Sequence, residues 1–226
     1  MEHPITVYIT ADSLISSLGV NTRENIEAIR KYRSGITQHE AGDISDAPIL
    51  AATINREFWN TVNGLDTYTR LEQLFILTIQ DILSHSGISL ADEDCGLILS
   101  TTKGNIDLLS RHPEEPDIQT YLWEMGRRIG GYFQANDRVE IISNACISGV
   151  SALIVAKRWI EYGKYKKVIV AGGDLLSHFI TSGFLSFKSI SSQICRPYDA
   201  RRNGLNLGEA CGAVLLSSEG KETDII

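Results

Sequence analysis

Cys146 has the clearest chemical setting of any residue in this sequence. The run "RVEIIS" before it predicts a β-strand, and "SGVSALIVAKRWIEYG" after it predicts an α-helix. A cysteine at this bend lies near the helix N-terminus, where unpaired N–H groups and the helix dipole favour a thiolate. The small residues Ala145, Ser148 and Gly149 leave room for a carbonyl group beside the backbone. The pattern indicates a nucleophile elbow, whose own N–H group can help to hold an oxyanion, although a free cysteine can also simply fill space in a core.

The other three cysteines lack this setting. Cys95, Cys195 and Cys211 lie within or beside apolar runs or in a loop, and we expect them to be structural. The cysteines show neither CxxC spacing nor nearby histidines, which argues against a metal site and against a disulfide framework. We therefore expect no bound metal and a reducing, cytoplasmic location.

A thiol nucleophile needs a group that takes up its proton, usually a histidine. None of the histidines lies in a motif that would position it beside Cys146. His178 follows the expected strand "KKVIVAGGD", and sites in α/β proteins gather at such strand ends, but a single loop histidine is more often not catalytic. The "AGGD" segment has neither the Walker spacing nor a GxGxxG fingerprint, so it is weak as a phosphate site.

Short β-rich runs alternate with helical patterns along the chain. The expected strands are residues 5–10, 95–100, 138–143, 166–173 and 212–217. The expected helices are residues 22–35, 68–87 and 150–163. This alternation predicts βαβ units and an α/β fold.

Each expected helix has its own signals. In the first, Thr22 is the expected N-cap, with apolar Ile26 and Ile29. The second ends at Gly87 and has one face made by Leu71, Leu74, Phe75, Thr78 and Ile82. The third ends at Gly163 and has a face made by Val150, Leu153, Ile154, Lys157 and Ile160. Two further segments, residues 111–119 and 188–212, have no clear period and are expected to form loops.

Composition and charge limit the possible functions. The chain has 226 residues, 43% of them hydrophobic and 22% charged, which is typical of a globular protein. A net charge of -7 disfavours nucleic acid as a partner, and we expect Arg127 and Arg128 to lie on a solvated face. No apolar run approaches the ~18 residues of a membrane span, and the N-terminus shows no basic leader, so we expect neither a membrane segment nor a signal peptide.

Four segments agree in order and spacing with one known family. They are "NACISG" with Cys146, "KKVIVAGGD", "GFLSFKSIS" and "CRPYDARRNGLNLGEACGAVLL". Together they resemble the β-ketoacyl-acyl-carrier-protein synthases of the thiolase fold, and "LILSTTKG" is similar to that family's second-strand glycine loop. The resemblance covers residues 7–217.

The resemblance implies that Cys146 takes an acyl chain from a phosphopantetheine thioester on an acyl carrier protein. The acyl-enzyme would then condense with a decarboxylated malonyl group, in fatty-acid or polyketide-type synthesis. Phe184 matches a position that lines the family's acyl pocket, and we expect Ile147, next to the nucleophile, to contact substrate as well. Lys103 replaces an apolar pocket residue of the family, which makes a plain long fatty chain less suitable; alternatively, it is a solvated loop lysine. No cofactor of the chain's own is expected, because phosphopantetheine enters on the carrier protein.

The family's fold has two similar halves, and this sequence resembles only the first. We therefore expect residues 1–226 to form a single thiolase-like N-terminal domain, an α/β half with a mixed, mostly parallel sheet and helices on both faces. Two histidines, a lysine and a second oxyanion-hole amide belong to the second half of the family, and no residue here matches them. The chain alone should be acylated at best, and it should pair as a homodimer or as a heteromer with a synthase subunit, because apolar surface left open usually marks an interface.

The sequence is also compatible with other functions. A non-catalytic partner resembling a chain-length factor would shape the tunnel of an active synthase, although such partners typically lack the nucleophile. A stand-alone cysteine acyltransferase or hydrolase would need a local base. A degradative thiolase fits less well, because the segments around "GFLSF" and "GEACG" favour the carrier-protein branch.

Overall fold

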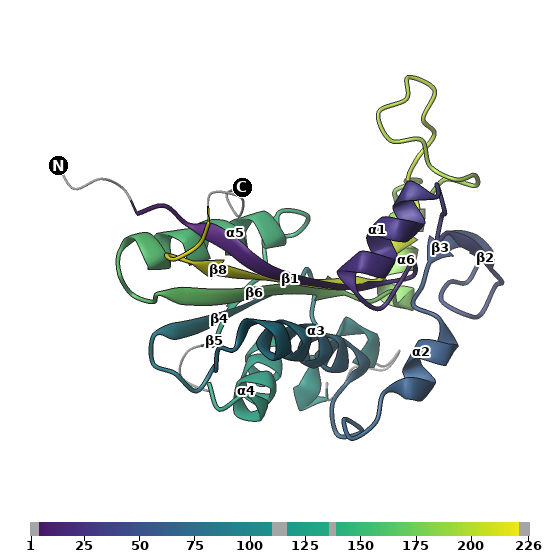
Figure 1. Ribbon diagram of the computed structural model, residues 1–226. Coiled ribbons are helices and arrows are strands. Elements are labelled where there is room, and N and C mark those ends of the chain that lie inside the picture. Colours follow the sequence, from purple (N-terminus) through teal and green to yellow (C-terminus); the bar gives the residue numbers. More distant parts are fainter. Residues whose placement is uncertain (1–4, 110–116, 136–138, 222–226) are drawn as a thin grey trace.

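A five-stranded sheet lies at the centre of the computed structural model, which describes residues 5–109, 117–135 and 139–221. The strand order is β1-β8-β6-β4-β5 (Figure 1). The strands are β1 (Tyr8–Ser16), β4 (Cys95–Ser100), β5 (Val139–Ile142), β6 (Lys167–Asp174) and β8 (Ala210–Ser217). Four strands run in one direction and β8 runs opposite to them, because β5, β4 and β6 pair in parallel and β8 is antiparallel to both β6 and β1. The expected mixed, mostly parallel sheet is confirmed.

Helices cover both faces of the sheet, as expected. Figure 1 shows α3 (Arg70–Ser86) and α4 (Leu122–Tyr132) below the sheet and α5 (Ser148–Glu161) above it. The α/β fold class is therefore confirmed.

The central strand β4 shows how the two layers are built. All six of its residues are buried, so it has no solvent-facing side. Leu97 and Leu99 pack into the core under α3 and α4, whereas Ile98 packs into the separate core under α5. This division follows from the alternation of side chains along a strand, and it explains why the strand is a continuous apolar run.

Helix α3 forms where the sequence predicts it. Its N-terminus has a capping box, in which Thr69 Oγ1 accepts from the N–H of Glu72 and the Glu72 carboxylate accepts from the N–H of Thr69. Gly87 ends the helix in the left-handed conformation, with φ of 66°. All five positions of the predicted apolar face are buried.

The N-cap prediction for α1 (Thr22–Arg30) is wrong by one residue. The cap is Asn21, whose side-chain oxygen accepts from the N–H of Glu24. The two isoleucines of this helix, Ile26 and Ile29, are exposed and do not form its inward face.

The inward side of α1 is partly polar. Asn25 is buried and donates to the carbonyl oxygens of Leu14 and Gly19, which fixes the helix against β1 and the loop that follows it. An amide that satisfies backbone carbonyls replaces the apolar contact that the sequence suggests.

The predicted inner face of α5 is only partly correct. Ile160 is buried and the half-buried Leu153 packs against the core under α5, whereas Lys157 is exposed. The helix packs on the sheet through Ala152, Ala156 and Ile160, which are buried. Small alanines let the helix approach the sheet closely, and the larger Val150 and Ile154 then point outward, 60% and 46% exposed.

A second, small sheet and several short helices were not expected from the sequence. The sheet has the order β2-β3-β7 and consists of β2 (Thr37–His39), β3 (Ile49–Ala52) and β7 (Leu207–Gly208). The helices are α2 (Arg56–Thr61), α6 (His178–Ser186) and the 3-10 turns Ile106–Leu108 and Ile118–Thr120.

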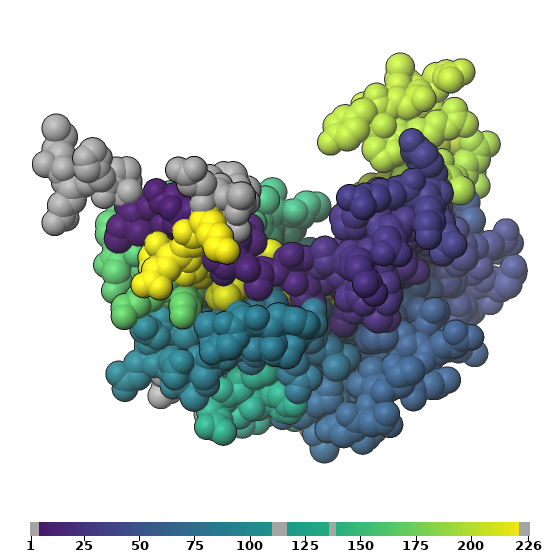
Figure 2. Space-filling view, viewed as in Figure 1, coloured from purple at the N-terminus to yellow at the C-terminus, as the bar shows by residue number. Residues whose placement is uncertain are grey.

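The two expected loop segments have different outcomes. Residues 188–206 contain no helix or strand and extend away from the body (Figures 1 and 2). The rest of that predicted loop is wrong, because residues 207–208 and 210–212 belong to β7 and β8. Residues 111–116 lie outside the described residues. Within the described part of the chain, no helix has the length and apolar character that crossing a membrane requires.

Arg128 does not lie on a solvated face, contrary to the sequence-based expectation. Its guanidinium lies 3.1 Å from the Glu72 carboxylate, which is fully buried, and it also donates to the carbonyl oxygen of Thr67. Arg127 is the exposed member of the two and pairs with Glu124 on its own helix. The buried Glu72 therefore joins the start of α3 to α4.

We expect Glu72→Ala to lower the free energy of unfolding by about 3 kcal/mol, because it leaves the Arg128 charge without its buried partner and removes half of the capping box. Urea denaturation measures this change. Lys157→Ala, which breaks an exposed helical ion pair with Glu161, is the control and should cost less than about 0.5 kcal/mol. Equal losses in the two variants would contradict a structural role for the buried pair.

Candidate active site

Cys146 lies at the bend between β5 and α5, as the sequence predicts. The thiol-bearing residue is exposed. Ala145, directly before it, has φ of 46°, in the left-handed region that residues other than glycine seldom adopt. The backbone therefore turns sharply at this point and presents Cys146 at the surface.

A single buried side chain closes this bend. Ser148 Oγ accepts from the N–H of Asn144 at 2.8 Å and donates to the carbonyl oxygen of Ala145 at 2.7 Å. Because both bonds span Cys146, they fix the backbone on each side of it.

The carboxyl ends of β4, β5 and β6 meet beside Cys146. Asp174, the last residue of β6, accepts hydrogen bonds from both threonines that follow β4: from Thr101 Oγ1 at 2.8 Å, and from the N–H and Oγ1 of Thr102 at 3.0 and 2.8 Å. Ser143, after β5, donates from Oγ to the carbonyl oxygen of Thr102 at 3.1 Å. These bonds hold the 101–104 loop against the bend that carries the thiol.

Cys146 opens into a shallow pocket of about 350 Å³. The wall is mostly backbone and small side chains: Ser100, Thr102, Ala145, Ser148, Gly149, Gly172, Gly173, Asp174, Gly208 and Ala210. None of these described wall residues is a histidine or a lysine. The pocket can therefore receive a group on the thiol, but it offers no basic side chain for proton transfer.

A larger, apolar pocket of about 770 Å³ lies against α6. Lys103 and Phe184, both predicted to bind substrate, line this pocket together. Ile147, the third such residue, is the N-cap of α5; it is 56% exposed and lines neither this pocket nor that of Cys146. His178 also lines the apolar pocket, and its Nδ1 lies 3.7 Å from the Asp46 carboxylate rather than beside the thiol.

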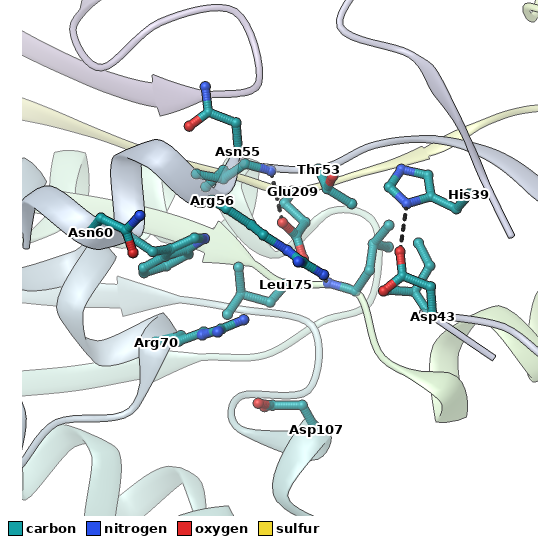
Figure 3. Close-up of a pocket in the computed structure, with 14 residues that line it drawn as sticks. His39, Asp43, Thr53, Asn55, Arg56, Asn60, Arg70, Asp107, Leu175 and Glu209 are labelled. Atoms are coloured by element: carbon teal, nitrogen blue, oxygen red, sulfur yellow. Dashed lines mark hydrogen bonds and ion pairs between the residues drawn. The ribbon is translucent and has the colours of Figure 1, made fainter.

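A polar pocket of about 500 Å³ lies between α2 and the start of β8 (Figure 3). Glu209 accepts from the N–H groups of Ile54 and Leu176 at 2.9 and 3.1 Å, so it joins two loops. Burial raises the pKa of the Glu209 carboxyl above its ordinary value, while the two N–H donors act in the opposite direction. Arg70 lies over the Trp59 ring, 5.3 Å from its centroid.

None of the remaining cysteines forms a disulfide bond among the described residues. Cys95 and Cys211 are buried, and Cys195 is half-buried in the long loop. Burial raises the pKa of the Cys211 thiol to about 12, and its Sγ lies 3.4 Å from Thr78 Oγ1. Cys211 is therefore a protonated core residue.

Sequence reasoning missed Asp174, Thr101 and Thr102, which position the site. Their contacts join residues more than 70 positions apart, so no local period reveals them. One signal was available: polar residues follow two expected parallel strands directly, and the carboxyl ends of such strands share one edge.

Residues 5–222 match the model of the beta-ketoacyl synthase N-terminal domain, and the chain belongs to this family. The 3-oxoacyl-[acyl-carrier-protein] synthase 2 of Vibrio harveyi is 24% identical over 93% of this chain and 57% of its own length. Probable polyketide synthase 10 of Dictyostelium discoideum is 27% identical over 65% of this chain and 6% of its own length.

Solved structures show the same thiolase-like fold. A ketosynthase in complex with its chain length factor, from Xenorhabdus doucetiae, has a TM-score of 0.75 at 22% identity and covers 98% of this chain and 60% of its own. The ishigamide ketosynthase/chain length factor has a TM-score of 0.76 at 20% identity, over 95% of this chain and 59% of its own. The chain thus spans well under two thirds of the length of these relatives.

We expect iodoacetamide to modify Cys146 before the other cysteines, because Cys146 is exposed whereas Cys95 and Cys211 are buried. Peptide mass spectrometry of the native protein measures the order of modification. Cys211 should stay unmodified even at about pH 10, since its thiol keeps its proton there.

Denatured protein, in which all four thiols should react, is the control for reagent access. A native protein in which Cys195 reacts before Cys146 would contradict the assignment of Cys146 as the accessible nucleophile.

Proposed function

We propose that Cys146 accepts an acyl group from the phosphopantetheine thioester of an acyl carrier protein, as the acylation step of a β-ketoacyl synthase. The observation that supports this most is the exposed thiol on a sharp, hydrogen-bonded bend within a backbone-lined pocket. Membership of the beta-ketoacyl synthase family supports the same chemistry.

The step balances without any further reactant. The Cys146 sulfur attacks the thioester carbonyl and forms a new carbon–sulfur bond, and the bond to the phosphopantetheine sulfur breaks. The proton of Cys146 ends on the released phosphopantetheine thiol. The helix N-terminus and the N–H groups near the bend can stabilise the thiolate and the oxyanion.

Condensation with a malonyl group needs more than this pocket offers. No histidine or lysine lines it among the described residues, so a group that assists decarboxylation must come from elsewhere. In the family these groups lie in the second half of the fold. We propose that such a half, or a synthase subunit that contains one, completes the site.

An apolar strip on α5 supports this partner. Ile147, Val150 and Ile154 are 56%, 60% and 46% exposed, and their spacing of three and four residues puts them on one side of the helix. The strip begins next to Cys146, so a partner that covers it would also reach the thiol. The partner would be a ketosynthase-type domain, supplied by a second copy of this chain or by another synthase subunit.

Acylation is tested by intact mass after the pure protein is mixed with acyl carrier protein loaded with a short acyl chain. We expect a mass gain of one acyl group, which is lost in Cys146→Ala and kept in the control Cys195→Ala. A folded protein that gains no mass would contradict the proposal and favour a non-catalytic partner resembling a chain-length factor.

Self-association is tested by light scattering over a range of concentrations. We expect the native chain to form dimers and Val150→Asp/Ile154→Asp to be monomeric, because two charges in a buried apolar contact have no partners. Tyr198→Asp, on the fully exposed tip of the 188–206 loop, should leave the dimer unchanged. A native protein that stays monomeric at every concentration would exclude the homodimer.

A further inference from the structure

The apolar pocket against α6 has an aromatic wall. Its apolar side chains are Leu109, Phe179, Ile180, Phe184 and Phe187. Phe179 and Phe187 are largely exposed, although rings of this size are usually buried. An open, ring-lined pocket of about 770 Å³ is suited to bind a hydrocarbon chain.

Of the charged and titratable groups that line this pocket, Asp46 and His178 lie near each other, whereas Lys103 forms an ion pair with neither. Asp46 lies opposite His178, with 3.7 Å between the carboxylate and Nδ1, and the Asp46 side chain is 76% exposed. Lys103 is exposed and has no hydrogen bond or ion pair with any other described residue. The apolar wall therefore carries a cation that the described part of the chain does not neutralise.

One loop contributes a residue to this pocket and a residue to the pocket of the thiol. Thr102 lines the Cys146 pocket, and the next residue, Lys103, lines the apolar pocket. Asp174 holds Thr102 through its N–H and its hydroxyl, so the loop that separates the two pockets is fixed. Helix α6, which carries the aromatic wall, starts four residues after Asp174. The two segments that line the apolar pocket, the loop with Lys103 and helix α6, thus follow residues that line the pocket of the thiol.

We propose that the apolar pocket selects acyl groups that end in a carboxylate, with the Lys103 ammonium as the group that pairs with that end. This inference rests on the proposed acylation of Cys146 and names its substrate class. A methyl-ended chain would remove water from the lysine without offering it a partner, which is unfavourable for a charge beside apolar surface. A terminal carboxylate supplies a charge-assisted hydrogen bond at the same place.

The test compares two carrier-protein thioesters of equal chain length, hexanoyl and adipoyl, which differ in the terminal carboxylate. Rates of Cys146 acylation are followed by intact mass for the native chain, Lys103→Met and Lys103→Arg. We expect the native chain to favour adipoyl by about tenfold, the size of one hydrogen bond to a charged group. Lys103→Met should lose this preference, and Lys103→Arg should keep most of it.

Two controls distinguish an ion pair between Lys103 and the terminal carboxylate from a general effect of removing a lysine. Lys157→Met, which removes an exposed lysine of α5, should leave the preference unchanged. The ratio of the adipoyl rate to the hexanoyl rate in the native chain should fall as salt is added, because salt screens an exposed charge pair.

The outcomes distinguish this inference from the proposed function. If Cys146 is acylated and both thioesters react equally in the native chain and in Lys103→Met, the carboxylate preference is wrong and the acylation stands. If the folded chain accepts neither thioester, the proposed function fails and the preference fails with it. If Lys103→Met lowers both rates equally, Lys103 supports the loop and does not select the acyl end.

Discussion

The parallel arrangement of β5, β4 and β6 is the constraint on which the candidate site depends. It brings the ends of three strands, distant in sequence, to one edge of the sheet. The Asp174 carboxylate then holds the threonines after β4, and Ser143 ties the same loop to the end of β5. The thiol and the apolar pocket are consequently fixed relative to each other by hydrogen bonds at strand ends.

The features that the sequence predicts correctly are those set by short-range patterns. The apolar face of α3 follows from a regular period, and the bend at Cys146 follows from a change of period. The strand cores are continuous apolar runs, which buried strands require. Hydrophobic periodicity does not predict that Lys103 and Phe184 line one pocket; that expectation came from the family resemblance.

The features that the sequence does not reveal depend on contacts between distant segments. The inner face of α5 is formed by Ala152, Ala156 and Ile160, whereas Val150 and Ile154 point outward. The strands β2 and β7 have only three and two residues, too few for any periodic signal. Asn25 shows the same limit in α1, because its buried amide satisfies carbonyl groups that only the folded chain brings near.

The two strands β1 and β8 are hydrogen-bonded in the sheet but are synthesised far apart in time. Among the described strands, β1 pairs only with β8, and Tyr8 lies opposite Ser217. On the ribosome, the first strand therefore emerges long before the strand that completes its hydrogen bonds, and contacts of such large sequence separation form slowly. During translation β1 therefore lacks its hydrogen-bonding partner until β8 has been made, and an unpaired strand can pair with other chains and aggregate.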